Sequence, residues 1–136
     1  MTGREDLRQR VRSEEPPSAS ASVVIRGGPD TPSLLQTHAK RLRRLYELDG
    51  EPVLGISVFV VLDDVGLASE RGILAGKLRS YPSLYRSTVG RLTGVGFVLL
   101  PTFHRPHFTI VLPALETVSD LATALGPLLA NPYAGG

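Results

Sequence analysis

The chain has 136 residues, of which 42% are hydrophobic and 21% are charged, and its formal net charge is +2. This composition is ordinary for one small folded domain and excludes a wholly disordered chain. The absence of cysteine excludes disulfides and thiolate metal sites, so we expect a protein of a reducing compartment, the cytoplasm.

The N-terminal segment, residues 1–21, combines alternating charges with the run SEEPPSAS. It has too little apolar surface to offset the entropy of ordering, so we predict a disordered tail. Residues 22–136 are predicted to form one globular domain. The longest apolar run, residues 52–62, is about half of the roughly 20 residues that a membrane-spanning helix needs. We therefore expect no association with a membrane.

The first half of the domain is predicted to contain two strands and a helix. The β-branched run 22–26 predicts a strand, which a glycine-rich turn ends. Thr31 is a predicted N-cap, and the apolar spacing after it predicts a helix that reaches Gly50. The nearly continuous apolar run 53–62 predicts a central strand that is buried on both faces and covered by helices.

The middle of the chain is predicted to alternate between short helices and a strand. The aspartates at 63–64 are expected to cap a helix over residues 67–78. Residues 81–86 are predicted to form a strand, and residues 87–92 a short helix with Ser87 as its N-cap.

The last part of the chain predicts an antiparallel hairpin, because residues 97–103 and 107–112 are apolar runs joined by a short link. A final helix is predicted over residues 118–125, and the turn-rich residues after it are expected to form no helix. The fold class is therefore α/β or α+β: one small domain with a mixed sheet of about four to five strands and helices packed on it.

The charged residues between Arg71 and Leu115 are all basic. Such a stretch can present a positive surface to phosphate groups. The alternative is that acidic residues from elsewhere in the fold, such as Asp63 and Asp64, pack beside these bases and cancel their field. The basic residues of the stretch are Arg71, Lys77, Arg79, Arg86, Arg91 and Arg105.

Polar residues cluster around the turn of the predicted hairpin, in the segment TFHRPHFT at 102–109. If the residues after the turn are extended, His107 and Thr109 lie on the same face of the sheet. Histidine suits proton transfer near neutral pH, so His107 and His104 are candidate acid/base groups. Thr109 is a candidate orienting residue, and Arg105 is a candidate phosphate-binding residue.

The sequence HFTI at 107–110 resembles one half of the paired His-x-Thr signature of the two-histidine phosphoesterases. In those enzymes one histidine acts as base and the other as acid, so the resemblance implies phosphoryl chemistry. This chain has no second copy, because His38 lies in the sequence THAK on the predicted helix. The alternative is a structural turn in which His104 is exposed and His107 is hydrogen-bonded.

Arg26 and Ser57 resemble the early arginine and the second-strand serine with which small ADP-ribosyltransferase toxins hold NAD. The resemblance implies a role in binding substrate or phosphate for both residues. That family also needs a catalytic glutamate, and the sequence ALET around Glu116 differs from its motif. The alternative for Arg26 is a cation that merely ends a strand.

The segments RGGPDT at 26–31, GISVF at 55–59 and LPTFHRPH at 100–107 resemble small uncharacterised proteins of bacterial two-gene toxin–antitoxin modules. The resemblance extends over residues 22–133. It implies an activity directed at RNA or a nucleotide, and a small partner protein.

These observations lead to one hypothesis and one rival. The hypothesis is an intracellular toxin-like enzyme, such as a hydrolase, that acts on RNA or a nucleotide by phosphoryl or nucleotidyl chemistry, without a metal or other cofactor. The rival is a non-catalytic, antitoxin-like or adaptor-like module that docks a partner protein or nucleic acid. Catalytic residues should gather in one concave pocket, whereas those of a docking module should scatter.

Overall fold

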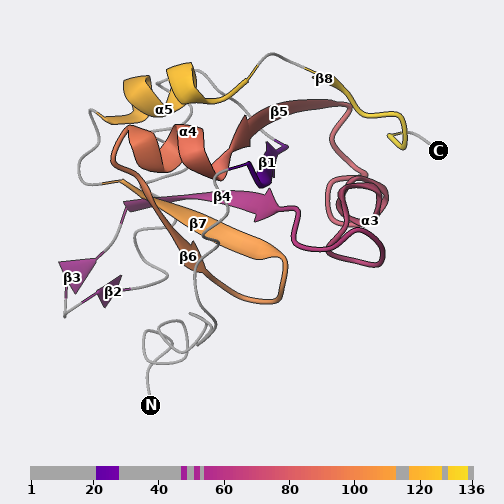
Figure 1. Ribbon diagram of the computed structural model, residues 1–136, viewed down its shortest axis with the longest axis horizontal. Helices are drawn as coiled ribbons and strands as arrows, with labels where there is room; N and C mark the ends of the chain where they lie inside the picture. The colour runs from indigo at the N-terminus through magenta and orange to yellow at the C-terminus, as the bar shows by residue number, and fades with distance from the viewer. Residues whose placement is uncertain are drawn as a thin grey trace.

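The computed structural model contains an open antiparallel sheet with helices on both faces (Figure 1). It describes residues 21–27, 47–48, 51–52, 54–112, 117–126 and 129–134. The strand order is β6-β7-β4-β1-β5-β8, with β1 (Val23–Arg26), β4 (Leu54–Val60), β5 (Ser83–Thr88), β6 (Val98–Pro101), β7 (His107–Leu112) and β8 (Leu129–Ala130). The described helices are α3 (Glu70–Ala75), α4 (Val89–Gly94) and α5 (Val118–Ala124). This small α+β fold confirms the predicted fold class, with six strands in the sheet.

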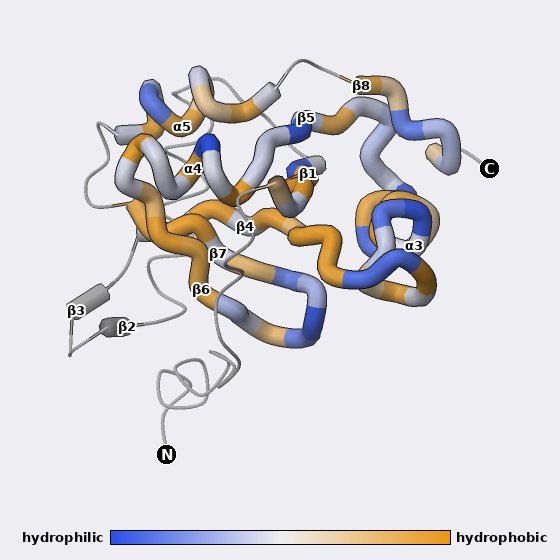
Figure 2. Tube along the Cα trace, viewed as in Figure 1, coloured by the Kyte–Doolittle hydropathy of each residue, from blue (hydrophilic) through white to orange (hydrophobic). Residues whose placement is uncertain are grey.

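The larger hydrophobic core lies between one face of the sheet and the helices α4 and α5 (Figure 1). Alternate residues of β4 and β7 reach this core because side chains alternate between the faces of a strand. The register places Val58 of β4 beside Phe108 of β7, and Leu92 and Leu121 of the two helices pack in the same cluster. Figure 2 shows β4, β6 and β7 as mostly hydrophobic. This face therefore supplies most of the apolar burial that stabilises the fold.

The opposite face of the sheet carries a smaller apolar cluster beneath α3. Its buried members are Ile25, Ile73, Leu78 and Leu84. Ser57 and Phe59 of β4 alternate with the residues of the larger core, so they lie on this opposite face. The register pairs Ser57 with Thr109 and Phe59 with His107. The smaller cluster therefore shares its face of the sheet with polar residues of β4 and β7.

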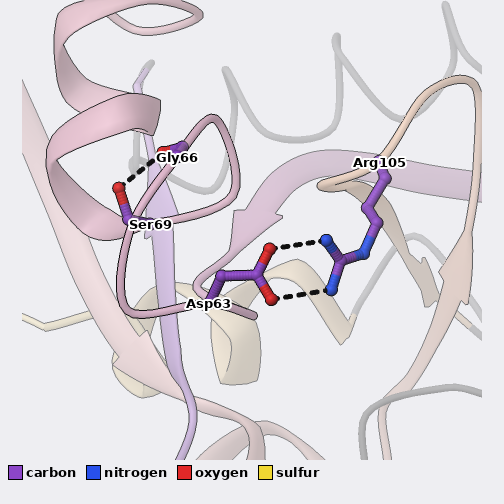
Figure 3. Close-up of polar contacts among 4 residues, drawn as sticks. All are labelled: Asp63, Gly66, Ser69 and Arg105. Carbon is purple, nitrogen blue, oxygen red and sulfur yellow. Dashed lines mark hydrogen bonds and ion pairs between the residues drawn. The ribbon is translucent and has the colours of Figure 1, made fainter.

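The N-cap of α3 is Ser69, which corrects a prediction from the sequence. Its Oγ accepts a 3.0 Å hydrogen bond from the Gly72 N–H. The same Oγ donates a 2.6 Å hydrogen bond to the Gly66 carbonyl, which Figure 3 shows. The sequence predicts a longer helix with the aspartates at 63–64 as its caps. That prediction is wrong because turns and bends separate these aspartates from the first helical residue.

The N-cap of α4 is Thr88, whose Oγ1 accepts a 3.1 Å hydrogen bond from the Arg91 N–H. The sequence predicts Ser87 for this position, and that prediction is wrong by one residue. Because β5 continues through Thr88, the alternation of the strand turns Ser87 towards α5. There its buried hydroxyl donates a 2.7 Å hydrogen bond to the carbonyl of Ala124.

Strand β1, strand β4, the β6–β7 hairpin and helix α5 confirm the corresponding predictions. The predicted helix does not extend to Gly50, because Glu47–Leu48 forms strand β2, which pairs with β3 (Glu51–Pro52). The rest of that helix and the predicted tail up to residue 20 lie outside the described residues. Strand β8 was not predicted from the sequence, because it depends on pairing with the distant strand β5.

Candidate functional site

A cavity of about 290 Å³ lies on the α3 side of the sheet, where β1, β4 and β7 are close together. Segments that are far apart in the sequence form its walls: the end of β1, the middle of β4, the start of β7 and the turn after α3. The lining residues are Arg26, Gly27, Ser57, Phe59, Lys77, Leu78, Tyr81 and His107. The cavity therefore combines cationic, aromatic and hydroxyl side chains.

Arg26 supplies a buried cation to this cavity. The residue is 3% exposed, and its Nη1 donates a 2.7 Å hydrogen bond to the backbone carbonyl of Ser57. Burial lowers the pKa of Arg26 to about 10, and an interaction with Tyr81 opposes part of that shift. A guanidinium with this pKa is still charged at neutral pH. An anionic ligand would offset the cost of holding that charge away from water.

The turn after α3 contributes Lys77, Leu78 and Tyr81 to the cavity. The ring of Tyr81 lies against the backbone of Gly27, because a Cβ at that glycine would be only 2.6 Å from Cγ of the tyrosine. Real atoms do not approach so closely. Any side chain at position 27 would therefore displace the Tyr81 ring from its place in the wall.

The C-terminal segment after β8 fixes this wall of the cavity. The buried side chain of Asn131 donates hydrogen bonds from Nδ2 to the carbonyls of Leu78 (2.8 Å) and Tyr81 (3.0 Å). Its backbone N–H donates a further 2.9 Å bond to the carbonyl of Pro82. Because these bonds hold backbone on both sides of the tyrosine, the position of Tyr81 depends on residues about fifty positions away.

His107 is held between two aromatic rings. The imidazole makes edge-type contacts with Phe59 (centroids 5.2 Å apart, planes at 85°) and Phe103 (5.0 Å and 74°). Phe59 is its cross-strand neighbour in β4. Phe103 has a φ of 55°, a left-handed conformation that is unfavourable for a bulky residue. The turn therefore maintains a costly backbone conformation at the residue that packs against His107.

A short chain of hydroxyl groups continues from His107 into the sheet. Thr102 Oγ1 lies 2.8 Å from His107 Nδ1 and 2.9 Å from Thr109 Oγ1, and both threonines are buried. A hydroxyl can accept a hydrogen bond from a protonated Nδ1 or donate one to an unprotonated Nδ1. Thr102 can therefore orient the imidazole in either protonation state.

The structure brings together several of the residues predicted from separate segments. Arg26, Ser57 and His107 line the same cavity. Thr109 does not line the cavity. Its hydroxyl is linked to His107 through the buried hydroxyl of Thr102, which hydrogen-bonds to both residues. Of the candidate catalytic residues only His107 lines the cavity, together with two of the three candidate phosphate-binding residues, Arg26 and Ser57.

Other residues of the cavity, and the buried residue behind His107, were not singled out from the sequence. Lys77 is only one member of the basic stretch, and nothing local shows that it faces a cavity. Tyr81 and Gly27 are important as a packed pair, which no sequence pattern reveals. Thr102 is part of the polar segment around the hairpin, and its contact with His107 depends on the register of that hairpin.

His104 and Arg105 are not among the lining residues and lie in the exposed turn between β6 and β7. The guanidinium of Arg105 donates two hydrogen bonds to the carboxylate of Asp63, at 2.7 and 3.1 Å (Figure 3). Arg86 forms an ion pair with Glu70 through Nη2. Acidic residues from elsewhere in the fold therefore neutralise part of the basic stretch, as one of the two interpretations of that stretch predicts.

Breaking the Arg105–Asp63 pair should change the titration of the aspartate. Hydrogen bonds from Arg105 hold the pKa of Asp63 below its usual value. The pair therefore stabilises the fold above that usual value, and its contribution is lost as the pH falls through the lowered pKa. We expect Arg105→Gln to raise the pKa of Asp63 in an NMR titration of the carboxyl carbon, and Arg79→Gln to leave it unchanged. An unchanged pKa in Arg105→Gln would contradict the pairing.

Among the described residues, no group of three or more His, Asp or Glu side chains is arranged to hold a metal ion. None of the helices in the described ranges is long and apolar enough to cross a membrane. Comparisons with protein-family models, curated proteins and solved structures found no match for the chain. The function is therefore inferred from the cavity itself.

Proposed function

We propose that the protein is a toxin-like enzyme that binds the phosphate of RNA or of a nucleotide in this cavity and catalyses phosphoryl or nucleotidyl chemistry. The observation that carries the proposal is the convergence of Arg26, Ser57 and His107 on one cavity. A cation that can bind phosphate and an imidazole that can transfer protons thus line the same cavity, which supports the proposal.

The charges of the cavity support an anionic ligand. Arg26 and Lys77 contribute cations, and no lining residue that the structure describes carries a carboxylate. Arginine suits phosphate through its planar set of donors, and lysine suits it as a point charge. The volume of about 290 Å³ is at the lower end of the range for small-molecule sites. Both features fit a phosphate group and a small attached moiety.

His107 can move the proton that phosphoryl transfer requires. As base, its Nε2 takes a proton from an attacking hydroxyl or water while a new P–O bond forms. The P–O bond to the leaving group then breaks, and the leaving oxygen receives that proton from the imidazolium. Throughout this exchange Nδ1–H donates to Thr102, whose Oγ1 lies 2.8 Å away. One histidine can therefore carry out both proton transfers, acting first as base and then as acid.

Removing the buried cation should weaken binding more than removing an exposed one. A hydrogen bond to a charged group contributes about 1.5–3 kcal/mol, so Arg26→Met should lower affinity for nucleoside monophosphates roughly 10- to 150-fold. Lys77→Met should also lower the affinity, and because Lys77 is exposed this variant leaves the buried residues unchanged. Arg79→Met, which removes an exposed arginine outside the lining, is the matched control. Isothermal titration at low salt measures the affinities, and circular dichroism checks folding.

The outcomes of this titration separate the hypothesis from its rival. Affinity that falls for Arg26→Met and Lys77→Met but not for Arg79→Met supports a phosphate site, and added salt should weaken it further. If the wild-type chain binds phosphates but releases no product from RNA or nucleotides, the docking module becomes the better description. If it binds neither class of ligand at low salt, the proposed function is wrong.

The toxin-like role also includes a small partner protein. That partner is proposed from the resemblance of the sequence segments alone. Affinity purification of the tagged full chain from its native host, followed by mass spectrometry, would identify such a partner. Recovery of the chain alone would count against the toxin–antitoxin part of the proposal.

A further inference from the structure

Tyr81 is an aromatic ring held in place beside a cationic cavity. It is 40% exposed although its phenol ring is one of the large apolar surfaces of the molecule. The backbone of Gly27, the residue directly after β1, packs against the ring, and Asn131 Nδ2 donates a 3.0 Å hydrogen bond to the tyrosine carbonyl. A rigid, partly exposed aromatic ring is a surface on which a planar group can stack.

The other two aromatic rings of the described lining, those of Phe59 and His107, contact each other. Phe59 makes an edge contact with His107 and packs against the smaller apolar cluster. Tyr81 is therefore the ring of the cavity that is best placed to meet a ligand. The cavity volume of about 290 Å³ suits one nucleotide unit and leaves little room for a second base.

We infer that the cavity accepts a single nucleotide unit, with its phosphate held by Arg26 and Lys77 and its base stacked on Tyr81. This inference rests on the proposed function and narrows its substrate class. The unit is either a free mononucleotide or the terminal nucleotide of an RNA strand, because both present the same phosphate and base.

The same site should discriminate little between the bases. Among the described lining residues no side chain carries a carboxylate or an amide, and the two cations that could read a guanine edge, Arg26 and Lys77, are assigned to the phosphate. The hydroxyls of Ser57 and Tyr81 can each donate or accept a hydrogen bond. Stacking is also tolerant of base identity, because every base has a π-face.

The test compares ligands that differ in one group. The full chain is titrated with the four nucleoside 5′-monophosphates, the matching nucleosides, ribose 5-phosphate, and a dinucleotide and an RNA oligomer that each carry a terminal phosphate. Stacking on an aromatic ring should make the monophosphates bind about 5- to 150-fold more tightly than ribose 5-phosphate. The four monophosphates should agree within about tenfold. Longer strands should bind within about tenfold of the mononucleotide, since one unit fills the cavity.

Variants of Tyr81 assign the effect to the ring. Tyr81→Phe keeps the ring and should keep the preference for nucleotide over ribose 5-phosphate, whereas Tyr81→Leu should abolish it. Equal binding of nucleotide and ribose 5-phosphate to the wild type would overturn the stacking inference and leave the phosphate site intact. An affinity that rises more than about tenfold with each added nucleotide would overturn the single-unit inference. If none of the phosphorylated ligands binds, the proposed function fails as well.

Discussion

His107→Ala is expected to lower turnover about 10²–10⁴-fold, which is the usual contribution of general acid–base catalysis. Affinity for nucleoside monophosphates should stay nearly unchanged, because the proposed phosphate-binding residues, Arg26 and Lys77, are intact in this variant. The separation of turnover from affinity is the signature of a group that acts on the reacting atoms. Chromatography of products from RNA oligomers and nucleotides measures turnover, and titration of the same samples measures affinity.

The matched comparison for this variant is His104→Ala. His104 is exposed and absent from the cavity lining, so its removal should change turnover by less than about twofold. A similar loss of turnover in both variants would mean that both histidines take part in catalysis, which would require the hairpin turn to move towards the cavity. A loss of affinity in His107→Ala equal to its loss of turnover would instead make the histidine a binding residue.

Phe108→Ala is expected to cost about 3–5 kcal/mol of the free energy of unfolding. Phe108 is 1% exposed and lies in the larger core between the sheet and the helices α4 and α5. Truncation removes its buried ring and leaves a cavity that the neighbouring strands cannot fill by collapsing. Because small domains have only about 5–15 kcal/mol in total, much of the chain should be unfolded at moderate temperature.

Urea denaturation followed by circular dichroism measures this effect, with Val98→Ala as the control. Val98 lies on the edge strand β6 and is 53% exposed, so its truncation should cost less than about 1 kcal/mol. Equal losses in the two variants would show that the face beneath α4 and α5 is not the main core.

The strands that carry the site could be predicted because their patterns are local. The apolar run of β4 and the two apolar runs of the β6–β7 hairpin each signal their structure within a few residues. The period of two residues along a strand also predicted that His107 and Thr109 lie on one face, and both contact the same hydroxyl of Thr102. Helix caps were harder, since Ser69 and Thr88 compete with equally suitable residues nearby.

The amino-acid sequence by itself determined the fold class, the positions of the main strands along the chain and which residue types were available for chemistry near β1, β4 and β7. Those properties follow from hydrophobic period and turn residues, which act over short distances. Only the tertiary structure decided which of the candidate residues contact one another or line the same cavity. Asp63 pairs with Arg105 across the fold, whereas Arg26 is buried against Ser57 in the cavity lining. Such contacts depend on strand register and on distant turns, so no local pattern contains them.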